Sequence, residues 1–235
     1  MKKEDIVVAL GTAHLITTPG KCSPDKKFRE PIYSREIISE VKPVISDVYG
    51  IKCFVDYEPL EPTKEMKSSS YKTEQIRELN YRVNFVNSLC DKYGASNVIY
   101  ISLHNDAAGA DNKWHDAGGF TVYTTRGTTI SDKLSESMYT AADSTLKYYR
   151  ERFEDLKKKG LYGKNQKPFR EDKTDGDRDK EADFYVIRKT RCASVLIEAM
   201  FQDNKADVEF LLSDEGRHGI ERTIIEGILR YIEDN

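Results

Sequence analysis

Two of the four histidines in the sequence follow apolar runs that are typical of buried strands. His14 comes shortly after the run 6–10, and His104 comes directly after the run 98–103. The carboxyl ends of parallel strands meet at one edge of a sheet, so we expect the two imidazoles to lie close together there. Imidazole groups and a carboxylate are common ligands of catalytic zinc, which keeps one coordination position open. The positions of these histidines therefore indicate a zinc site.

The third ligand should be a carboxylate that reaches the same edge of the sheet. Glu36 is the first candidate, because it falls in the first turn of a helix predicted over residues 33–49. Glu30 and Glu40 are weaker candidates, and Asp106 is a further one. A single histidine in a loop is more often structural or solvated, and these residues lack a compact spacing such as HExxH. Taken alone, the pattern is a weak signal.

Glu198 stands at the end of a predicted strand, where only apolar residues are expected. Burying a carboxylate there is costly unless the carboxylate has a partner. One interpretation is a structural ion pair with Arg188, Lys189 or Arg191. The other is a general base whose pKa is adjusted by burial and by a nearby cation.

Strands and helices alternate along the chain, which predicts an α/β fold. We expect one domain over residues 1–235, with a twisted, mostly parallel mixed sheet of about six strands flanked by helices. The predicted strands cover residues 6–10, 51–57, 98–103, 119–124, 184–187 and 193–198. The predicted helices cover residues 33–49, 72–93, 130–158, 204–212 and 214–232, the last with Ser213 as its N-cap.

Residues 159–182 differ from the rest of the chain, because charged residues and glycine dominate and apolar anchors are few. Long loops of this kind are usually functional or disordered. One interpretation is a mobile loop beside the cleft that binds substrate through Arg170 and Arg178. The other is an ordinary solvated loop.

Composition narrows the classes of partner. The 235 residues include 37 Lys and Arg against 40 Asp and Glu, for a formal charge of −3, which argues against a nucleic acid as partner. No apolar run approaches the roughly 18 residues of a membrane span, and the N-terminus does not resemble a secretory signal. The four cysteines form no CxxC pair, as expected of reduced thiols. We expect a monomer that is made in the cytosol.

Several motifs follow one another through nearly the whole chain. They are His14 after the first strand, Ser34-Arg35-Glu36-Ile37, Leu79-Asn80-Tyr81-Arg82 with Val86-Asn87, Ser102-Leu103-His104-Asn105-Asp106-Ala107, Ala117-Gly118-Gly119-Phe120-Thr121-Val122-Tyr123, Val186-Ile187-Arg188, Val195-Leu196-Ile197-Glu198-Ala199-Met200-Phe201 and Asn204-Lys205-Ala206-Asp207. In this order they resemble the zinc-dependent N-acetylmuramoyl-L-alanine amidases of the Amidase_3 type, which include bacterial cell-wall amidases and phage endolysins. One departure is Ala13-His14-Leu15, where the family usually has Gly-His-Gly.

The resemblance implies hydrolysis of the amide between N-acetylmuramic acid and L-alanine in peptidoglycan. It implies that His14, Glu36 and His104 hold Zn²⁺ and that Glu198 moves the proton from water to the leaving amine. Arg82 and Asn87 are either structural or support the ligands. The protein would act on the cell wall after release from the cytosol.

Two other classes of function stay open at this point. One is a zinc peptidase or deacetylase that uses the same ligands on another substrate, because a shared sheet does not fix the substrate. The other is a non-catalytic glycan-binding module, although such a module would have no use for a complete ligand set.

Overall fold

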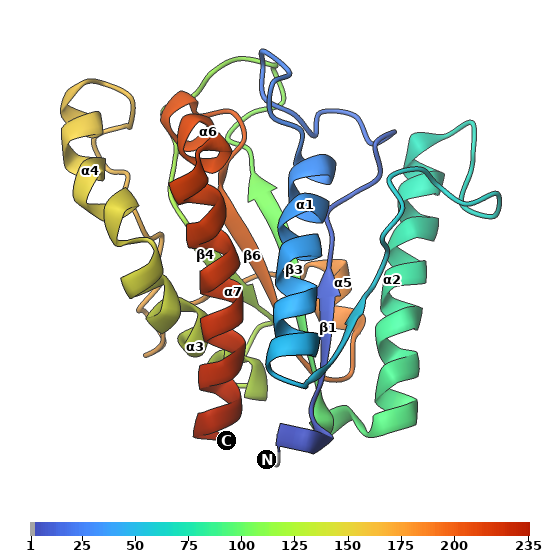
Figure 1. Cartoon of the computed structure of the whole chain (residues 1–235). Coiled ribbons are helices and arrows are strands. Elements are labelled where there is room, and N and C mark those ends of the chain that lie inside the picture. Colours follow the sequence, from blue (N-terminus) through green and yellow to red (C-terminus); the bar gives the residue numbers. More distant parts are fainter. Residues whose placement is uncertain (1–2) are drawn as a thin grey trace.

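The computed structural model describes residues 3–235, which form one sheet with helices on both of its faces (Figure 1). The six strands lie in the order β2-β1-β3-β6-β4-β5. Each neighbouring pair is parallel except β4 and β6, which are antiparallel. The predicted α/β fold with a mixed, mostly parallel sheet is therefore confirmed. The strands are Val7–Gly11 (β1), Lys52–Val55 (β2), Val98–Asp106 (β3), Thr121–Thr124 (β4), Lys180–Glu181 (β5) and Ala193–Phe201 (β6).

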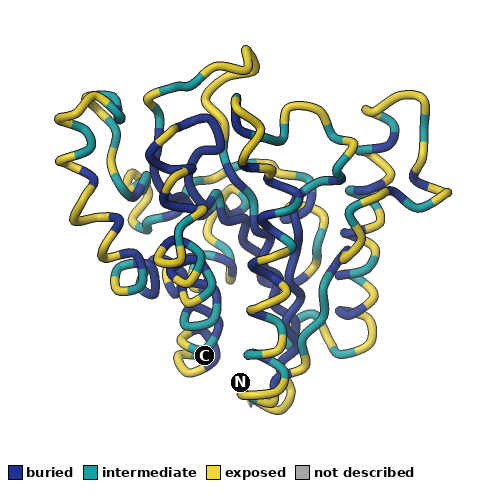
Figure 2. The backbone as a smooth tube through the Cα atoms, turned by 45° about the horizontal axis from the view of Figure 1, so that its top comes forward, coloured by how far each residue is buried: buried dark blue, intermediate teal, exposed yellow. Residues whose placement is uncertain are grey.

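The helices cover the sheet in two layers. On one face lie α1 (Glu30–Pro43), α3 (Ile130–Thr145) and α7 (Asp214–Asp234), whose apolar residues join the larger hydrophobic core. On the other face lie α2 (Tyr71–Tyr93) and α5 (Tyr185–Lys189), which pack in a second core. Buried residues follow the strands and the inner sides of the helices, whereas the connecting loops are mostly exposed (Figure 2). The strand ends therefore project from a core that is packed on both sides.

Polar side chains mark where the long helices begin. Ser70 accepts a hydrogen bond from the Thr73 amide at the start of α2, and Thr129 forms a capping box at the start of α3. Ser213 accepts from the Gly216 amide at the start of α7, so the predicted N-cap is confirmed. The remaining elements are the 3-10 turns Lys3–Asp5 (η1) and Ala95–Asn97 (η3), the π-helical turn Val44–Val48 (η2), and the helices Lys147–Lys158 (α4) and Lys205–Leu212 (α6).

Two predicted elements differ in the structure. The run 184–187, predicted as a strand, lies in helix α5, and the two-residue β5 completes the sheet instead. Val186 and Ile187 are buried in the second core, so a short helix gives the same apolar signal as a strand. The helix predicted over 130–158 is interrupted at Leu146, whose φ of −102° and ψ of 22° separate α3 from α4.

The charged segment 159–182 packs on the domain at several points. Tyr162 and Phe169 are buried in the larger core and anchor the segment there, which the expectation of few apolar anchors did not include. Arg170 Nη1 donates a hydrogen bond of 2.6 Å to Asp106 at the end of β3. Arg178 is held by Asp143 of α3 instead. Of the two arginines, only Arg170 thus contacts the end of β3.

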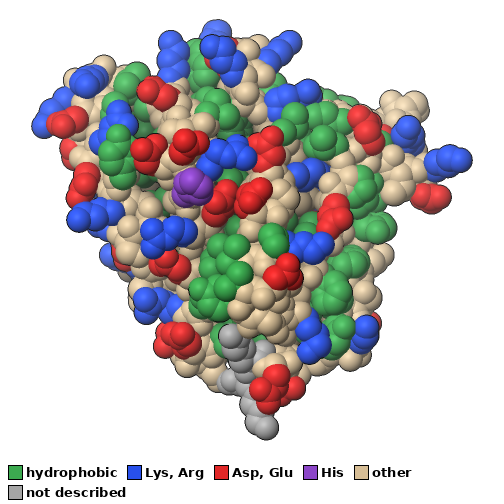
Figure 3. Space-filling model, viewed as in Figure 1, with side chains coloured by type: hydrophobic (Ala, Val, Ile, Leu, Met, Phe, Trp, Pro, Cys, Tyr) green, Lys and Arg blue, Asp and Glu red, His purple; other side chains and the backbone are tan. Residues whose placement is uncertain are grey.

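Acidic and basic side chains are interspersed on the face that α1 and α7 present (Figure 3). The small formal charge of −3 is thus accompanied by mixing of both signs on this face. Among residues 3–235, no helix is both long enough and apolar enough to cross a lipid bilayer.

Candidate active site and metal centre

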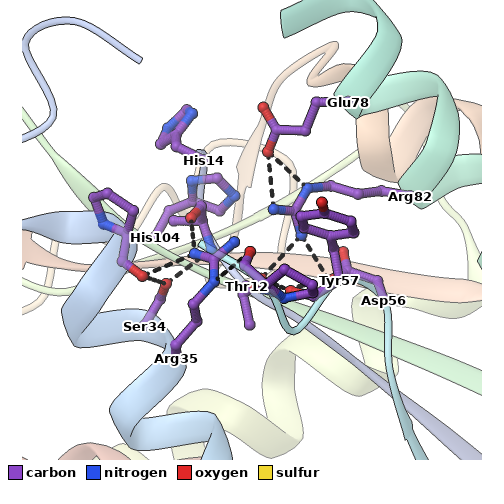
Figure 4. Close-up of polar contacts among 12 residues, drawn as sticks. Thr12, His14, Ser34, Arg35, Asp56, Tyr57, Glu78, Arg82 and His104 are labelled. Atoms are coloured by element: carbon purple, nitrogen blue, oxygen red, sulfur yellow. Dashed lines mark hydrogen bonds and ion pairs between the residues drawn. The ribbon is translucent and has the colours of Figure 1, made fainter. Parts of the chain in front are cut away.

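The two predicted histidines meet at the carboxyl ends of the parallel strands. His14 follows β1, and His104 lies near the end of β3 (Figure 4). Their ring centroids are 5.0 Å apart, and the ring planes are nearly perpendicular at 83°. The expectation that the sheet brings the imidazoles together is therefore confirmed.

The carboxylate between the two rings belongs to Glu30. Its Oε1 lies 3.1 Å from His104 Nδ1 and 3.4 Å from His14 Nε2, and it accepts a hydrogen bond of 3.1 Å from the Asn105 amide. The side chain is fully buried, and Lys21 Nζ lies 3.6 Å from its Oε2. His14, Glu30 and His104 thus form one compact group of possible metal ligands.

Glu36 does not lie in this group, so the prediction that Glu36 reaches the two histidines is wrong. Its side chain is 49% exposed and forms an ion pair of 2.9 Å with Arg217 of α7. The physical reason is the start of the helix. α1 begins at Glu30 rather than at residue 33, so the turn nearest the sheet edge holds Glu30, and Glu36 lies more than one turn further along.

The weaker carboxylate candidates are also separated by the structure. Glu40 is exposed on α1, and Asp106 is engaged by Arg170. A signal for Glu30 was present in the sequence, because Pro31 follows it and proline favours the first positions of a helix. Reading Pro31 as a helix start would have placed Glu30 at the sheet edge.

The chemistry of these three possible ligands fits a divalent metal such as zinc. In a tetrahedral zinc site the ligand atoms lie about 3.3 Å from one another, close to the two separations from Glu30. Burial lowers the pKa of both His14 and His104, which favours the neutral imidazole that a metal requires. Burial alone would raise the pKa of Glu30, but His14, Lys21 and His104 hold it well below the usual value. Glu30 Oε2 is buried without a hydrogen-bond partner among the described residues.

Glu198 lies beside this group on the neighbouring strand. It is the register partner of His104 across β3 and β6, so both side chains leave the sheet on the same side. Its Oε2 is buried and has no hydrogen-bond partner among the residues described. Burial, and then the carboxylates of Asp106 and Glu30, raise the pKa of Glu198 well above that of an ordinary glutamate.

The alternative reading of Glu198 as half of a structural ion pair does not hold. Arg188, Lys189 and Arg191 precede the amino end of β6, whereas Glu198 lies towards its carboxyl end. Among the described residues, none of these three cations forms an ion pair with Glu198. Arg191 pairs with Asp91 of α2 instead.

Comparison with known proteins identifies one protein family over nearly the whole chain. The family model for N-acetylmuramoyl-L-alanine amidase matches residues 8–230. The chain belongs to this amidase family. Curated protein sequences give no significant match to this amidase.

Solved structures show that the fold of this amidase recurs. The CwlD amidase from Clostridioides difficile, solved in complex with the GerS lipoprotein, superposes with a TM-score of 0.68 at 17% identity, over 98% of this chain and 100% of that one. The catalytic domain of CwlV from Bacillus (Paenibacillus) polymyxa gives 0.67 at 14% identity, over 98% and 99% of the two chains. The catalytic domain of the CD27L endolysin, which targets Clostridia difficile, gives 0.56 at 18% identity, over 96% and 97%.

The two family-motif residues Arg82 and Asn87 of α2 have different surroundings. Asn87 donates to the Lys189 carbonyl and accepts from the Arg191 amide, so it fixes the turn before β6. Arg82 is buried and hydrogen-bonds to Thr12, two residues before His14. Asn87 is therefore structural, whereas Arg82 contacts the turn that carries His14.

Proposed function

We propose that this amidase cleaves the amide bond between N-acetylmuramic acid and L-alanine in peptidoglycan, with one Zn²⁺ held by His14, Glu30 and His104. The family match supports the bond and the substrate. The single observation that carries the metal assignment is the buried Glu30 carboxylate placed between the two imidazoles. When bound, Zn²⁺ would activate a water molecule for attack and polarise the carbonyl of the scissile amide.

The surroundings of the ligands hold them ready for a metal. The Asn105 amide and Lys21 both contact Glu30, which keeps its carboxylate charged and oriented. Burial lowers the pKa of both imidazoles and so favours their neutral form, whose nitrogens can donate an electron pair to a metal. These contacts pre-organise the site and reduce the rearrangement that metal binding requires.

Glu198 is the proposed proton-transfer residue. Its carboxylate would take a proton from the attacking water and give it to the leaving nitrogen of the amide. A raised pKa suits both steps, because the carboxylate becomes a stronger base and its protonated form persists closer to neutral pH. Lys21 and Arg170 lower the pKa of Glu198 and so limit this shift. Glu198 is not required as a metal ligand, because Glu30 fills that role.

The decisive experiment is mass spectrometry of fragments released from purified cell walls. We expect stem peptides with a free N-terminal L-alanine and glycan strands whose lactyl groups carry a free carboxylate. The matched control is the Glu198→Gln protein, which should release neither product at the wild-type rate. Zinc content of the wild type, measured by elemental analysis, should be close to one per chain.

Other products would support the alternatives. Cuts within the stem peptide would indicate a peptidase, loss of acetyl groups a deacetylase, and binding without any product a glycan-binding module. A wild-type protein that cleaves the amide but holds no metal after full loading with Zn²⁺ would contradict the zinc assignment while leaving the substrate assignment intact.

A further inference from the structure

The backbone of the turn that carries His14 is strained. His14 has a φ of 42°, in the left-handed region that favours glycine. Its neighbours Ala13 and Leu15 are fully buried, so the turn is packed rather than free to relax. A non-glycine residue persists in this conformation only where its surroundings hold it there.

One side of the turn is held by α1. Ser34 Oγ accepts a hydrogen bond of 2.9 Å from the Ala13 amide. Arg35 Nη1 donates a bond of 2.8 Å to the Ala13 carbonyl. Both polar groups of the residue before His14 are therefore fixed by consecutive residues of one helix.

The other side of the turn is held by a buried ion pair that joins the end of β2 to α2 (Figure 4). Arg82 Nη1 lies 2.6 Å from Asp56 Oδ1 and donates a second hydrogen bond of 3.1 Å to Thr12 Oγ1. The same Asp56 Oδ1 accepts a bond of 3.1 Å from the Thr12 amide. Tyr100 donates to Asp56 Oδ2 at 2.8 Å and so orients the carboxylate. Both members of the pair thus form a hydrogen bond with Thr12: Arg82 donates one and Asp56 accepts one.

We propose that Arg82 and Asp56 are a positioning pair, which holds Thr12 and thereby fixes His14 for binding Zn²⁺. This inference rests on the zinc site proposed above. A buried ion pair is by itself a weak source of stability, because removing both charges from water offsets their attraction. Both residues of the pair are only 2% exposed. What the pair specifically provides is the conformation of the turn that carries His14.

Glu78 provides a matched control within the same network. It is as buried as Arg82 and binds Arg82 Nε at 2.9 Å, on the side away from Asp56. In the part of the chain that the structure describes, Glu78 has no hydrogen bond or ion pair with residues 12–15. If Arg82 only stabilised the fold, losing its contact with Glu78 or with Asp56 would weaken Zn²⁺ binding alike. If Arg82 positions the turn, only the loss of the contacts with Asp56 and Thr12 should weaken Zn²⁺ binding.

The test measures Zn²⁺ affinity, by competition with a chelating dye, on metal-depleted protein. Arg82→Lys keeps a cation but loses the rigid guanidinium whose Nη1 bonds Asp56 and Thr12 while its Nε bonds Glu78. Thr12→Val removes the hydroxyl without leaving a buried charge, so it also tests the link if the arginine variant fails to fold. We expect Arg82→Lys to weaken Zn²⁺ binding about 10–100-fold, as is usual for residues that support a metal ligand. Thr12→Val should weaken it in the same direction, and the two effects should not add.

The control sets the result that overturns the proposal. Glu78→Gln should lower the melting temperature but leave Zn²⁺ affinity within about twofold of the wild type, a difference too small for a lost ligand support. The proposal is overturned if Glu78→Gln weakens binding as much as Arg82→Lys, or if Thr12→Val and Arg82→Lys both bind Zn²⁺ like the wild type.

A metal-free measurement separates this proposal from the proposed function. Hydrogen exchange of the Thr12 amide, followed by NMR in metal-depleted protein, reports the turn directly. Arg82→Lys should speed this exchange at least tenfold relative to Glu78→Gln, and equal rates would overturn the positioning role. If the wild type binds no Zn²⁺ at all, the proposed metal site fails and the positioning of His14 is judged on this exchange alone.

Discussion

The carboxylate of Glu30 meets the imidazole of His104 at the sheet edge, with Oε1 3.1 Å from Nδ1. The two residues are far apart in the sequence, and each reaches this point because an element begins or ends there: α1 begins at Glu30, and β3 ends two residues after His104. The contact makes Glu30, a weaker candidate than Glu36 by sequence, the proposed third ligand.

Replacing Glu30 and Glu36 by glutamine in two separate variants tests this assignment. Glu30→Gln should lose Zn²⁺ affinity by more than the roughly 10–100-fold that supporting residues cost, because it removes the charged ligand itself. Glu36→Gln removes only an exposed ion pair with Arg217, so affinity should stay unchanged and stability should fall by at most about 1 kcal/mol. Elemental analysis and thermal melting measure both effects. Loss of zinc in Glu36→Gln alone would restore the original interpretation.

The parts of the site that depend on local sequence patterns could be predicted from the sequence. The apolar runs before His14 and His104 predict buried parallel strands, and the geometry of such sheets then places both histidines at one edge. The sequence ranks Glu30 behind Glu36 because the apolar periodicity of α1 starts later than the helix itself. A proline directly after a glutamate was a better marker of the helix start than the apolar stripe.

The parts that the sequence did not predict depend on contacts between distant residues. Thr12 follows β1, Asp56 follows β2 and Arg82 lies in α2, and no local pattern shows that their side chains meet. The left-handed backbone of His14 cannot be seen in the sequence either, because the position holds a histidine and not a glycine. The sequence predicts a strand in place of helix α5 because five residues are too few to display a helical period.

Asp207 should be a stability residue rather than a catalytic one. Its buried Oδ1 accepts hydrogen bonds from Tyr149 and Tyr162, and Oδ2 accepts from the Phe201 and Gly119 amides. Asp207→Ala leaves these donors buried without a partner, so the free energy of unfolding should fall by at least about 3 kcal/mol. Chemical denaturation measures this, with exposed Glu209→Ala on the same helix as the control. A loss below about 1 kcal/mol, the net value of a single hydrogen bond, would contradict this role.

Arg170 and Arg178 should separate into an activity residue and a stability residue. Arg170 pairs with Asp106 and lowers the pKa of Glu198, so Arg170→Ala should raise that pKa further. Because the base must be deprotonated, the acid limb of kcat/KM should move to higher pH. Arg178→Ala should leave the limb in place and lower stability by about 1–2 kcal/mol, since it loses charged hydrogen bonds to α3. Identical pH profiles for Arg170→Ala and the wild type would contradict the first part.

Glu198→Gln should separate proton transfer from metal binding. The substitution keeps the shape of the side chain, and none of the three proposed ligands is altered, so Zn²⁺ content should stay at the wild-type level. Turnover should fall by about 10²–10⁴-fold, the usual effect of removing a positioned proton-transfer group. The remaining activity should lack the acid limb that the wild type shows. A metal-free Glu198→Gln protein would make Glu198 a ligand, and near-normal turnover would make it structural.

The raised pKa of Glu198 also predicts how stability depends on pH in the metal-depleted protein. Burial and the neighbouring carboxylates make the folded state bind this proton more tightly than the unfolded chain does. The corresponding stabilisation is complete below the pKa of an ordinary glutamate and is lost as pH rises through the higher folded-state pKa. Glutamine does not titrate, so Glu198→Gln does not show this pH-dependent loss of stability. The melting temperature of the variant should therefore rise relative to that of the wild type as the buffer is changed from pH 4 to pH 8. A constant difference between the two proteins across this range would show that Glu198 has no raised pKa, and its assignment as the proton-transfer residue would then lack its electrostatic basis.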